Sequence, residues 1–354
     1  MKRIVLVAAF LGSFAFAGQA MAGNTYKVYL GQQGPSPAGV PKTAFLDQFL
    51  PSKLTVNAGD SVTFSSATFH TVTYAPKPAP LLRPDPAKGT YDELLDASSS
   101  PFYFNALPKF IYNPAALGPY GPKSIGGKTP ASSGVLSPPG RKPATATFSF
   151  PKPGVYHLFC QVHPGMKGTV VVKPAATPVP ATPAQVQAQA LVETAAAFAK
   201  AKAIAAAAKP HANTVIMGIG TTSTLLGYYP ARLSVKAGTT VTFVNKAPSE
   251  VHNVTFGPKK YILALSKKID LFPTSPGSPN QVAPLLIYGT EPKGQYNYDG
   301  TNHGNGFFAT PLTAGSPAIP LPRTSKVTFT AAGTYHYFCW IHGPDMSGTI
   351  VVTS

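Results

Sequence analysis

Cysteine, tryptophan and acidic side chains are scarce in this 354-residue sequence. It contains two cysteines, one tryptophan and 12 Asp or Glu residues against 29 Lys or Arg residues. Two cysteines exclude a disulfide-rich scaffold. Beyond the first 22 residues, no apolar run reaches the roughly 18 residues of a spanning helix, so we expect a soluble or peripheral mature protein. No nucleophile and base pattern or phosphate-binding loop is present either, which argues against the common classes of hydrolase and nucleotide-binding enzyme.

The N-terminus has the pattern of an export signal. Lys2 and Arg3 precede an apolar run over residues 4–17, and Ala20-Met21-Ala22 offers small residues at a cleavage site. We therefore expect residues 1–22 to be a signal peptide and the mature protein to act in the periplasm. An uncleaved N-terminal anchor is the alternative.

Both cysteines lie in a pattern that occurs twice, over residues 156–163 (YHLFCQVH) and 335–342 (YHYFCWIH). A histidine stands three residues after each cysteine, and Met166 or Met346 follows shortly after it. A thiolate, imidazoles and a thioether form a soft ligand set that favours copper, and a trigonal site needs one more histidine. A disulfide between Cys160 and Cys339 is the alternative, but it would require two equivalent strand ends to meet.

The repeat extends well beyond the cysteines. Residues 54–64 (LTVNAGDSVTF) align with residues 233–243 (LSVKAGTTVTF), and both patterns predict strand, glycine turn and strand in a hairpin. Because β-branched and aromatic runs alternate with Gly and Pro, we predict an all-β fold of two Greek-key β-sandwiches. The expected domains are residues 23–173 and 213–354.

Residues 174–212 form a Pro- and Ala-rich linker between these domains. Thr182 can cap a helix that begins at Pro183, and the Ala-rich stretch that follows favours that helix. About 25 residues at roughly 1.5 Å each would span nearly 40 Å, so a straight helix could hold the domains apart. Its apolar stripe is ragged, and docking on a domain is not predicted.

The upstream histidine of each repeat follows the glycine turn. His70 precedes Thr71 and Val72, and His252 precedes Asn253 and Val254. This histidine, the Ala-Gly turn and the closing Cys-x-x-His with a trailing Met resemble the plastocyanin and amicyanin branch of the cupredoxins, the blue copper proteins. The resemblance covers most of both domains.

The resemblance implies one type 1 copper in each domain, with the methionine as a weak axial ligand. The implied ligands are His70, Cys160, His163 and Met166 in the first domain and His252, Cys339, His342 and Met346 in the second. Thr71 and Asn253 match the position of the residue that steadies the cysteine loop. The second ligand loop is one residue longer, so the two sites should differ. Inserts of unknown placement, ordered or disordered, separate His70 from Cys160 and His252 from Cys339.

A protein of this kind is expected to carry single electrons between redox partners and not to be an enzyme. Multicopper enzymes place histidines beside the cysteine, whereas Phe159, Gln161, Phe338 and Trp340 stand there in this chain. The ring edges of His163 and His342 would meet partners such as c-type cytochromes or oxidases. The excess of basic residues favours redox partners whose docking face is acidic, or peripheral association with a membrane. Nucleic acid is not expected as a partner. Copper storage, delivery or sensing is the alternative function.

Overall fold

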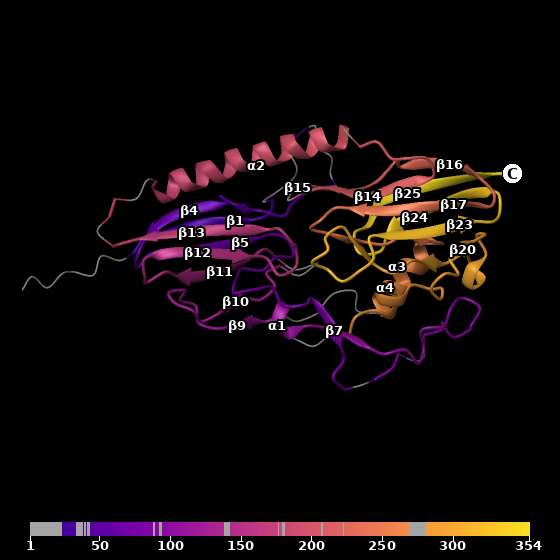
Figure 1. The fold of residues 1–354 in the computed structure, drawn as a ribbon, viewed down its shortest axis with the longest axis horizontal. Helices are drawn as coiled ribbons and strands as arrows, with labels where there is room; N and C mark the ends of the chain where they lie inside the picture. Colours follow the sequence, from indigo (N-terminus) through magenta and orange to yellow (C-terminus); the bar gives the residue numbers. More distant parts are fainter. Residues whose placement is uncertain are drawn as a thin grey trace, which may run out of the picture.

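Two β-sandwiches lie side by side in the computed structural model of the chain (Figure 1). The structure describes residues 23–32, 38, 40, 43–87, 89–91, 94–137, 142–175, 177–178, 181–206, 208–221, 223–268 and 281–354. The expected signal peptide, residues 1–22, lies outside the described residues. Within the described residues, no helix is both long enough and apolar enough to cross a membrane. The prediction of an all-β fold of two β-sandwiches is confirmed.

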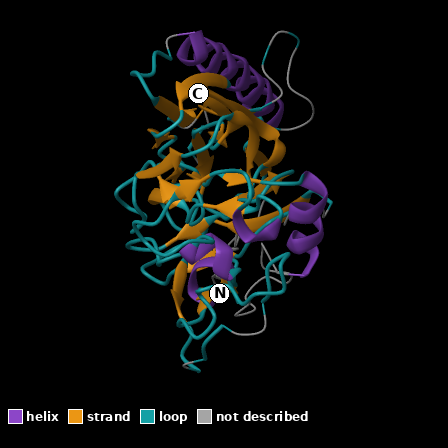
Figure 2. Cartoon of the chain, turned by 90° about the vertical axis from the view of Figure 1, so that its right-hand side faces the viewer, coloured by secondary structure: helices purple, strands orange, loops and turns teal. Residues whose placement is uncertain are grey.

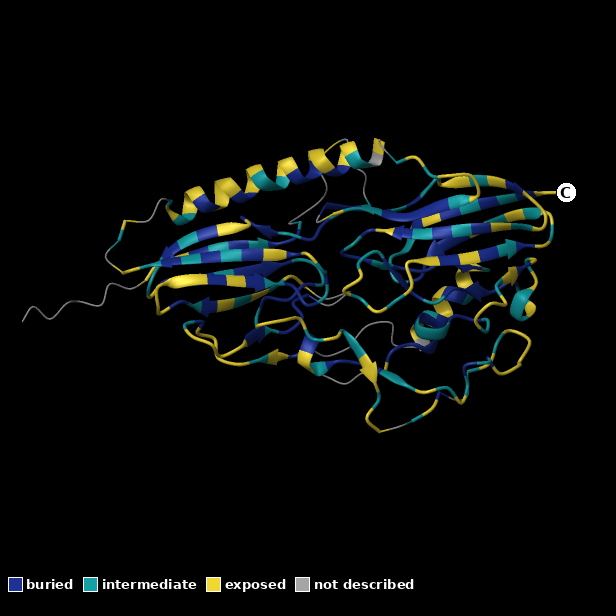
Figure 3. Ribbon diagram, in the orientation of Figure 1, coloured by how far each residue is buried: buried dark blue, intermediate teal, exposed yellow. Residues whose placement is uncertain are grey.

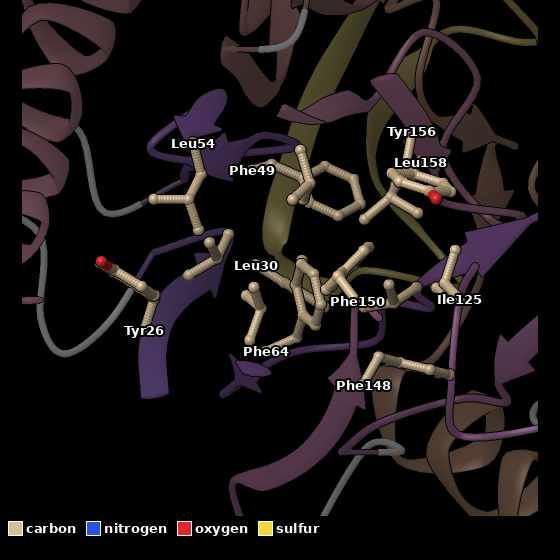
Figure 4. Close-up of a cluster of buried hydrophobic side chains, with 14 of the residues drawn as sticks. Tyr26, Leu30, Phe49, Leu54, Phe64, Ile125, Phe148, Phe150, Tyr156 and Leu158 are labelled. Atoms are coloured by element: carbon tan, nitrogen blue, oxygen red, sulfur yellow. The ribbon is translucent and has the colours of Figure 1, made fainter. Parts of the chain in front are cut away.

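The first sandwich consists of a four-stranded and a six-stranded sheet. The smaller sheet has the order β11 (Ala144–Ser149), β5 (Ser61–Ser66), β1 (Thr25–Leu30) and β3 (Phe49–Leu50). The larger has the order β4 (Lys53–Asn57), β13 (Lys167–Lys173), β12 (Gly154–Phe159), β6 (Thr73–Tyr74), β10 (Ala131–Ser133) and β9 (Pro119–Tyr120). Alternate side chains of both sheets, such as those of Tyr26, Phe64 and Leu158, meet in a core of aromatic and branched residues (Figure 4).

The second sandwich repeats this arrangement. One sheet has the order β2 (Ala44–Leu46), β15 (Ser223–Tyr229), β14 (Thr214–Gly220), β17 (Thr239–Lys246), β23 (Thr324–Phe329) and β20 (Asn297–Tyr298). The facing sheet has the order β16 (Arg232–Lys236), β25 (Gly343–Thr353), β24 (Gly333–Cys339), β19 (Thr255–Phe256) and β21 (Phe308–Ala309). Two short pairs complete the set, β18 (Val251–His252) with β22 (Thr313–Ala314) and β7 (Leu82–Pro84) with β8 (Phe110–Tyr112).

The strands that flank the glycine turn do not form the expected hairpin. β4 pairs with β13 in one sheet, whereas β5 pairs with β1 and β11 in the other. The chain therefore crosses between the sheets at Gly59, whose φ of +99° suits glycine. The prediction was wrong because alternation identifies strands but does not say which strands pair. β16 and β17 repeat the crossing in the second sandwich.

Helix α2 (Pro183–Ala206) forms the linker and contacts both sandwiches. It begins at Pro183 as predicted, and Thr182 and Gln185 exchange two hydrogen bonds at its start, of 2.8 and 3.4 Å. Its inner face packs on β1, β2 and β3 at one end and on β14 and β15 at the other, and its outer face is exposed (Figure 3). Figure 2 shows the helix at the edge of the molecule, outside the strands. The helix thus joins the sandwiches along their sides and does not hold them apart.

Segments of the first domain also join the second. β2, from the first half of the chain, pairs antiparallel with β15, with Leu46 opposite Ser223. The insert between His70 and Cys160 packs its aromatic residues Tyr91, Phe102 and Phe104 into one buried cluster with the second insert. That second insert carries α3 (Lys259–Lys268), α4 (Pro284–Tyr288) and the 3₁₀ turn η1 (Asn302–Gly304), while the short α1 (Pro114–Leu117) belongs to the first. The described parts of both inserts form an ordered layer that connects the two sandwiches.

His303 lies within this layer, between carboxylates of the two inserts. Its Nδ1 is 3.1 Å from Asp96 Oδ2 of the first insert, and its Nε2 is 3.0 Å from Glu291 Oε1 of the second. Burial opposes the charge on His303, but the two carboxylates outweigh it and raise its pKa. Burial likewise opposes ionisation of Asp96, yet hydrogen bonds from Ser98, Ser100 and His303 lower its pKa. His303 therefore bridges the two inserts electrostatically.

Candidate metal centres

The structure brings three of the predicted ligands of the first domain into contact. Cys160 directly follows β12, and its Sγ is 3.5 Å from His163 Nδ1 and 3.9 Å from His70 Nδ1. The two Nδ1 atoms are 2.9 Å apart. Cys160 N–H donates to the Met166 carbonyl at 3.0 Å, which closes the ligand loop. His70 approaches from outside this loop, held by a bridge to Leu136.

The second domain repeats the set with small differences. Cys339 Sγ is 3.3 Å from His342 Nδ1 and 3.9 Å from His252 Nδ1, and the two Nδ1 atoms are 3.2 Å apart. The additional residue of this loop is accommodated by a register shift between β24 and β25 at Phe338 and Cys339. The two sites therefore share their chemistry but differ in loop geometry.

Each set fits a single transition-metal ion. Such an ion lies about 2.0–2.3 Å from nitrogen and sulfur ligands, so donors up to about 4 Å apart can share it. The three donors of each set lie within 4.8 Å of one another. Met166 and Met346 are completely buried in the same core clusters as their cysteines. Both cysteines are free thiols, so they are not joined in a disulfide. The donor chemistry, two imidazoles and a thiolate beside a thioether, is that of a type 1 copper site.

A glycine makes room for the upstream histidine at each site. A Cβ on Gly31 would lie 2.6 Å from His70 Nε2, and one on Gly218 would lie 2.3 Å from His252 Nε2. Both glycines have a positive φ, +69° and +59°. A side chain at either position would press on the outer edge of the ring, so glycine leaves the ring room to turn Nδ1 toward the cysteine.

Thr71 and Asn253 lie beside the cysteine loops, as the resemblance implies. Thr71 Oγ1 accepts from Gln161 N–H at 2.8 Å, and Asn253 Oδ1 accepts from Trp340 N–H at 2.9 Å. In both domains the backbone N–H of the residue after the cysteine thus donates a hydrogen bond to the side chain of the residue after the upstream histidine. A hydroxyl and an amide perform the same task because each offers an oxygen acceptor.

Glu250 is the main site residue that the sequence did not reveal. Its Oε1 is 3.5 Å from His163 Nε2 of the first domain, and its Oε2 is 3.4 Å from His342 Nε2 of the second. The only signal in the sequence is its place two residues before His252, where the first domain has Thr68. Neither the spacing nor the residue type indicated that one carboxylate would serve both halves of the molecule.

The expectation that the ring edges of His163 and His342 meet a partner is therefore wrong for this structure. His163 is 8% exposed, and both Nε2 atoms face Glu250 between the sandwiches. Both histidines border one cavity of about 1080 Å³, which Asp47 and Glu250 also line. By contrast, His157 and His336 are exposed on their strands, as alternation predicts.

Burial and neighbouring charges together set the protonation of the metal-free sites. Burial opposes ionisation of Cys160 and Cys339, but the downstream histidines outweigh it and hold both thiol pKa values well below their usual range. Burial also opposes charge on His163 and His342, yet the adjacent acidic groups and thiolates raise the pKa of each to about 10. Copper binding must therefore displace a proton from these rings.

The two buried carboxylates between the sites have pKa values shifted in opposite directions. Burial opposes ionisation of Glu250, but His163 and His342 lower its pKa to about 2. Burial raises the pKa of Asp47, and the Ser249 hydroxyl is 2.6 Å from Asp47 Oδ2. The two histidines thus favour the ionised form of Glu250. Asp47 serves as a contact across the domains, because it belongs to the first and Ser249 to the second.

Comparison with known proteins agrees with this geometry. The model of the copper-binding proteins of the plastocyanin/azurin family matches residues 214–353. A reduced Cu(I) form of an amicyanin mutant at pH 4 is similar at 22% identity over 42% of this chain and 89% of that chain, with a TM-score of 0.22. A purple cupredoxin from Nitrosopumilus maritimus is similar at 18% identity over 40% of this chain and 100% of that chain, with a TM-score of 0.23. No curated protein matches. The family match thus covers the second domain, and residues 214–353 are similar to the copper-binding proteins of the plastocyanin/azurin family.

Proposed function

We propose that the protein is an electron carrier that holds one type 1 copper in each domain. The single observation that carries this proposal is the occurrence of two sets of His, Cys and His donors, each with a buried methionine in the same core cluster as its cysteine. Copper, when bound, supplies a one-electron couple. The rigid sandwich holds the donors in fixed positions, so little rearrangement accompanies the change of charge.

Export to the periplasm and service to acidic redox partners are parts of the same proposal. The net charge of +17 favours encounter with an acidic cytochrome or oxidase, or with an anionic membrane surface. Because the ring edges of His163 and His342 face Glu250 between the sandwiches, we place the docking face for such a partner elsewhere on the surface. Besides the two donor sets, the described residues contain a third group of possible metal ligands, Asp47, His163 and Glu250, which shares His163 with the first set.

Metal analysis and absorption spectroscopy of the full chain test the proposal. We expect two copper ions per chain and intense thiolate-to-copper absorption that bleaches with one electron per copper and returns on oxidation. Cys160→Ala and Cys339→Ala should each retain one copper and one band, whereas the exposed His157→Ala and His336→Ala should retain both. A colourless holoprotein would refute the proposal. Release of copper on reduction would instead support the alternative, storage or delivery.

A further inference from the structure

A single buried carboxylate connects the two donor sets. Glu250 contacts His163 of the first domain through Oε1 and His342 of the second through Oε2, at 3.5 and 3.4 Å. We propose that Glu250 is a shared positioning residue that couples the two copper sites, so that the state of one site changes the reduction potential of the other. The proposal rests on the proposed function, because it needs a copper in each domain.

The orientation of both rings supports this role. In each domain Nδ1 faces the cysteine thiolate, and Nε2 faces Glu250. An imidazole that binds a metal through Nδ1 keeps its proton on Nε2, where a carboxylate can accept it and fix the plane of the ring. In the common arrangement of this kind, one carboxylate holds one metal-binding histidine in position. Here one carboxylate steadies a ligand of each site, so a displacement of either ring moves the partner of the other.

Glu250 is itself held in place by neighbouring residues of both domains. Its carbonyl accepts from Asn245 Nδ2 at 3.1 Å, and its N–H donates to the Ala247 carbonyl at 3.3 Å. The preceding residue, Ser249, is anchored to Asp47 of the first domain. The connection between β17 and β18 therefore cannot shift freely, and its carboxylate stays between the two rings.

Charge provides a second form of coupling. Glu250 is buried and lies within 3.5 Å of both rings. A buried carboxylate interacts more strongly with nearby charge than an exposed one, because little water screens it. With copper bound, its negative charge would favour the more positive, oxidised state of both sites.

Glu250→Gln in the full holoprotein tests the proposal, with the reduction potential of each site as the measurement. Cys160→Ala and Cys339→Ala backgrounds isolate the two sites. We expect both potentials to rise, each by at least a tenfold change in electron partition, or 59 mV for a one-electron couple. Glu291→Gln is the matched control, because Glu291 also contacts a histidine, His303, but lies away from both sites. It should leave both potentials unchanged.

Two further measurements separate coupling from a local effect. With Glu250 present, the potential of the first site should depend on whether the second holds copper, and this dependence should disappear in Glu250→Gln. Glu250→Asp keeps the charge but shortens the side chain, so it should also abolish the dependence of the first potential on copper at the second site. It replaces Glu250→Gln in this measurement if the Gln variant does not fold. Unchanged potentials, a change at one site only, or a third metal ion bound per chain would overturn the proposal. Failure of the wild-type chain to bind two coppers would instead refute the proposed function.

Discussion

Asn253 offers a sharp test of how the second cysteine loop is held. Its Oδ1 accepts from Trp340 N–H at 2.9 Å, and its Nδ2 donates to Thr255 Oγ1 and to the Thr310 carbonyl at 3.2 and 3.3 Å. Asn253 is completely buried. Asn253→Thr installs the residue of the first domain and retains an oxygen acceptor, whereas Asn253→Val has the same shape as Thr without it. The difference between these two variants isolates one hydrogen bond to a buried amide.

The expected cost follows from the burial of that amide. In the valine variant Trp340 N–H has no acceptor, and leaving a buried donor unpaired costs about 1–3 kcal/mol. Asn253→Thr should itself be less stable than the wild type, because the two bonds from Nδ2 are lost. We therefore expect the order wild type, Thr variant and Val variant, with Thr and Val separated by about 1–3 kcal/mol.

Guanidinium unfolding of the metal-free full chain measures this difference. Trp340 is the only tryptophan and lies next to Cys339, so its fluorescence reports on the second domain and on the layer of inserts that packs against it. Thr240→Val is the matched control, because the exposed hydroxyls of Thr240 and Thr328 are 2.8 Å apart in the same domain and water can replace either one. Its transition should match that of the wild type. Equal midpoints for Asn253→Thr and Asn253→Val would show that the acceptor does not stabilise the loop.

Other positions give independent tests. Gly218→Ala should reduce copper binding at the second site, because the new Cβ would displace His252 from the cysteine. Gly238→Ala is the control, since its Cβ would meet open space and the change should lower only the stability. Metal analysis of both variants measures the difference. Phe198→Ala in α2 should cost about 3–5 kcal/mol in thermal unfolding, since the ring is buried. His303→Gln should speed hydrogen exchange around Asp96, and most strongly between about pH 4 and 6.5. The stability from the raised pKa of His303 is lost at higher pH, and the stability from the lowered pKa of Asp96 is lost at lower pH.

Local patterns in the sequence were sufficient to predict the strands and the ligand sets. The spacing from Cys160 to His163 and Met166 defines a tight loop, and alternation along β12 places Cys160 on the buried face, as the structure shows. The start of α2 was predictable because the Thr182 cap and Pro183 act over a few residues. Whether the eight predicted ligands hold copper remains a prediction, although the structure brings the donors of each set together.

Features that depend on distant contacts were not predictable. The docking of α2 uses small residues, such as Ala190, Ala197 and Ala201, which are buried against the sheets but contribute little to an apolar stripe. A helix with an alanine face can approach strands closely. The weak apolar stripe in the sequence of α2 was therefore compatible with a docked helix. The placement of the inserts and the contact of Glu250 with both histidines likewise depend on how the two domains meet, which no local pattern records.

The difference between the two repeats at the position of Glu250 has a physical basis. The equivalent residue in the first domain is Thr68, which lines the same cavity as Glu250. Because the downstream histidines of both domains face this cavity, one carboxylate can contact both. A second glutamate at position 68 would place a further acidic group beside Asp47 and Glu250, and buried like charges disfavour ionisation. The duplicated domains can therefore carry different residues at this position, because a single carboxylate contacts both rings.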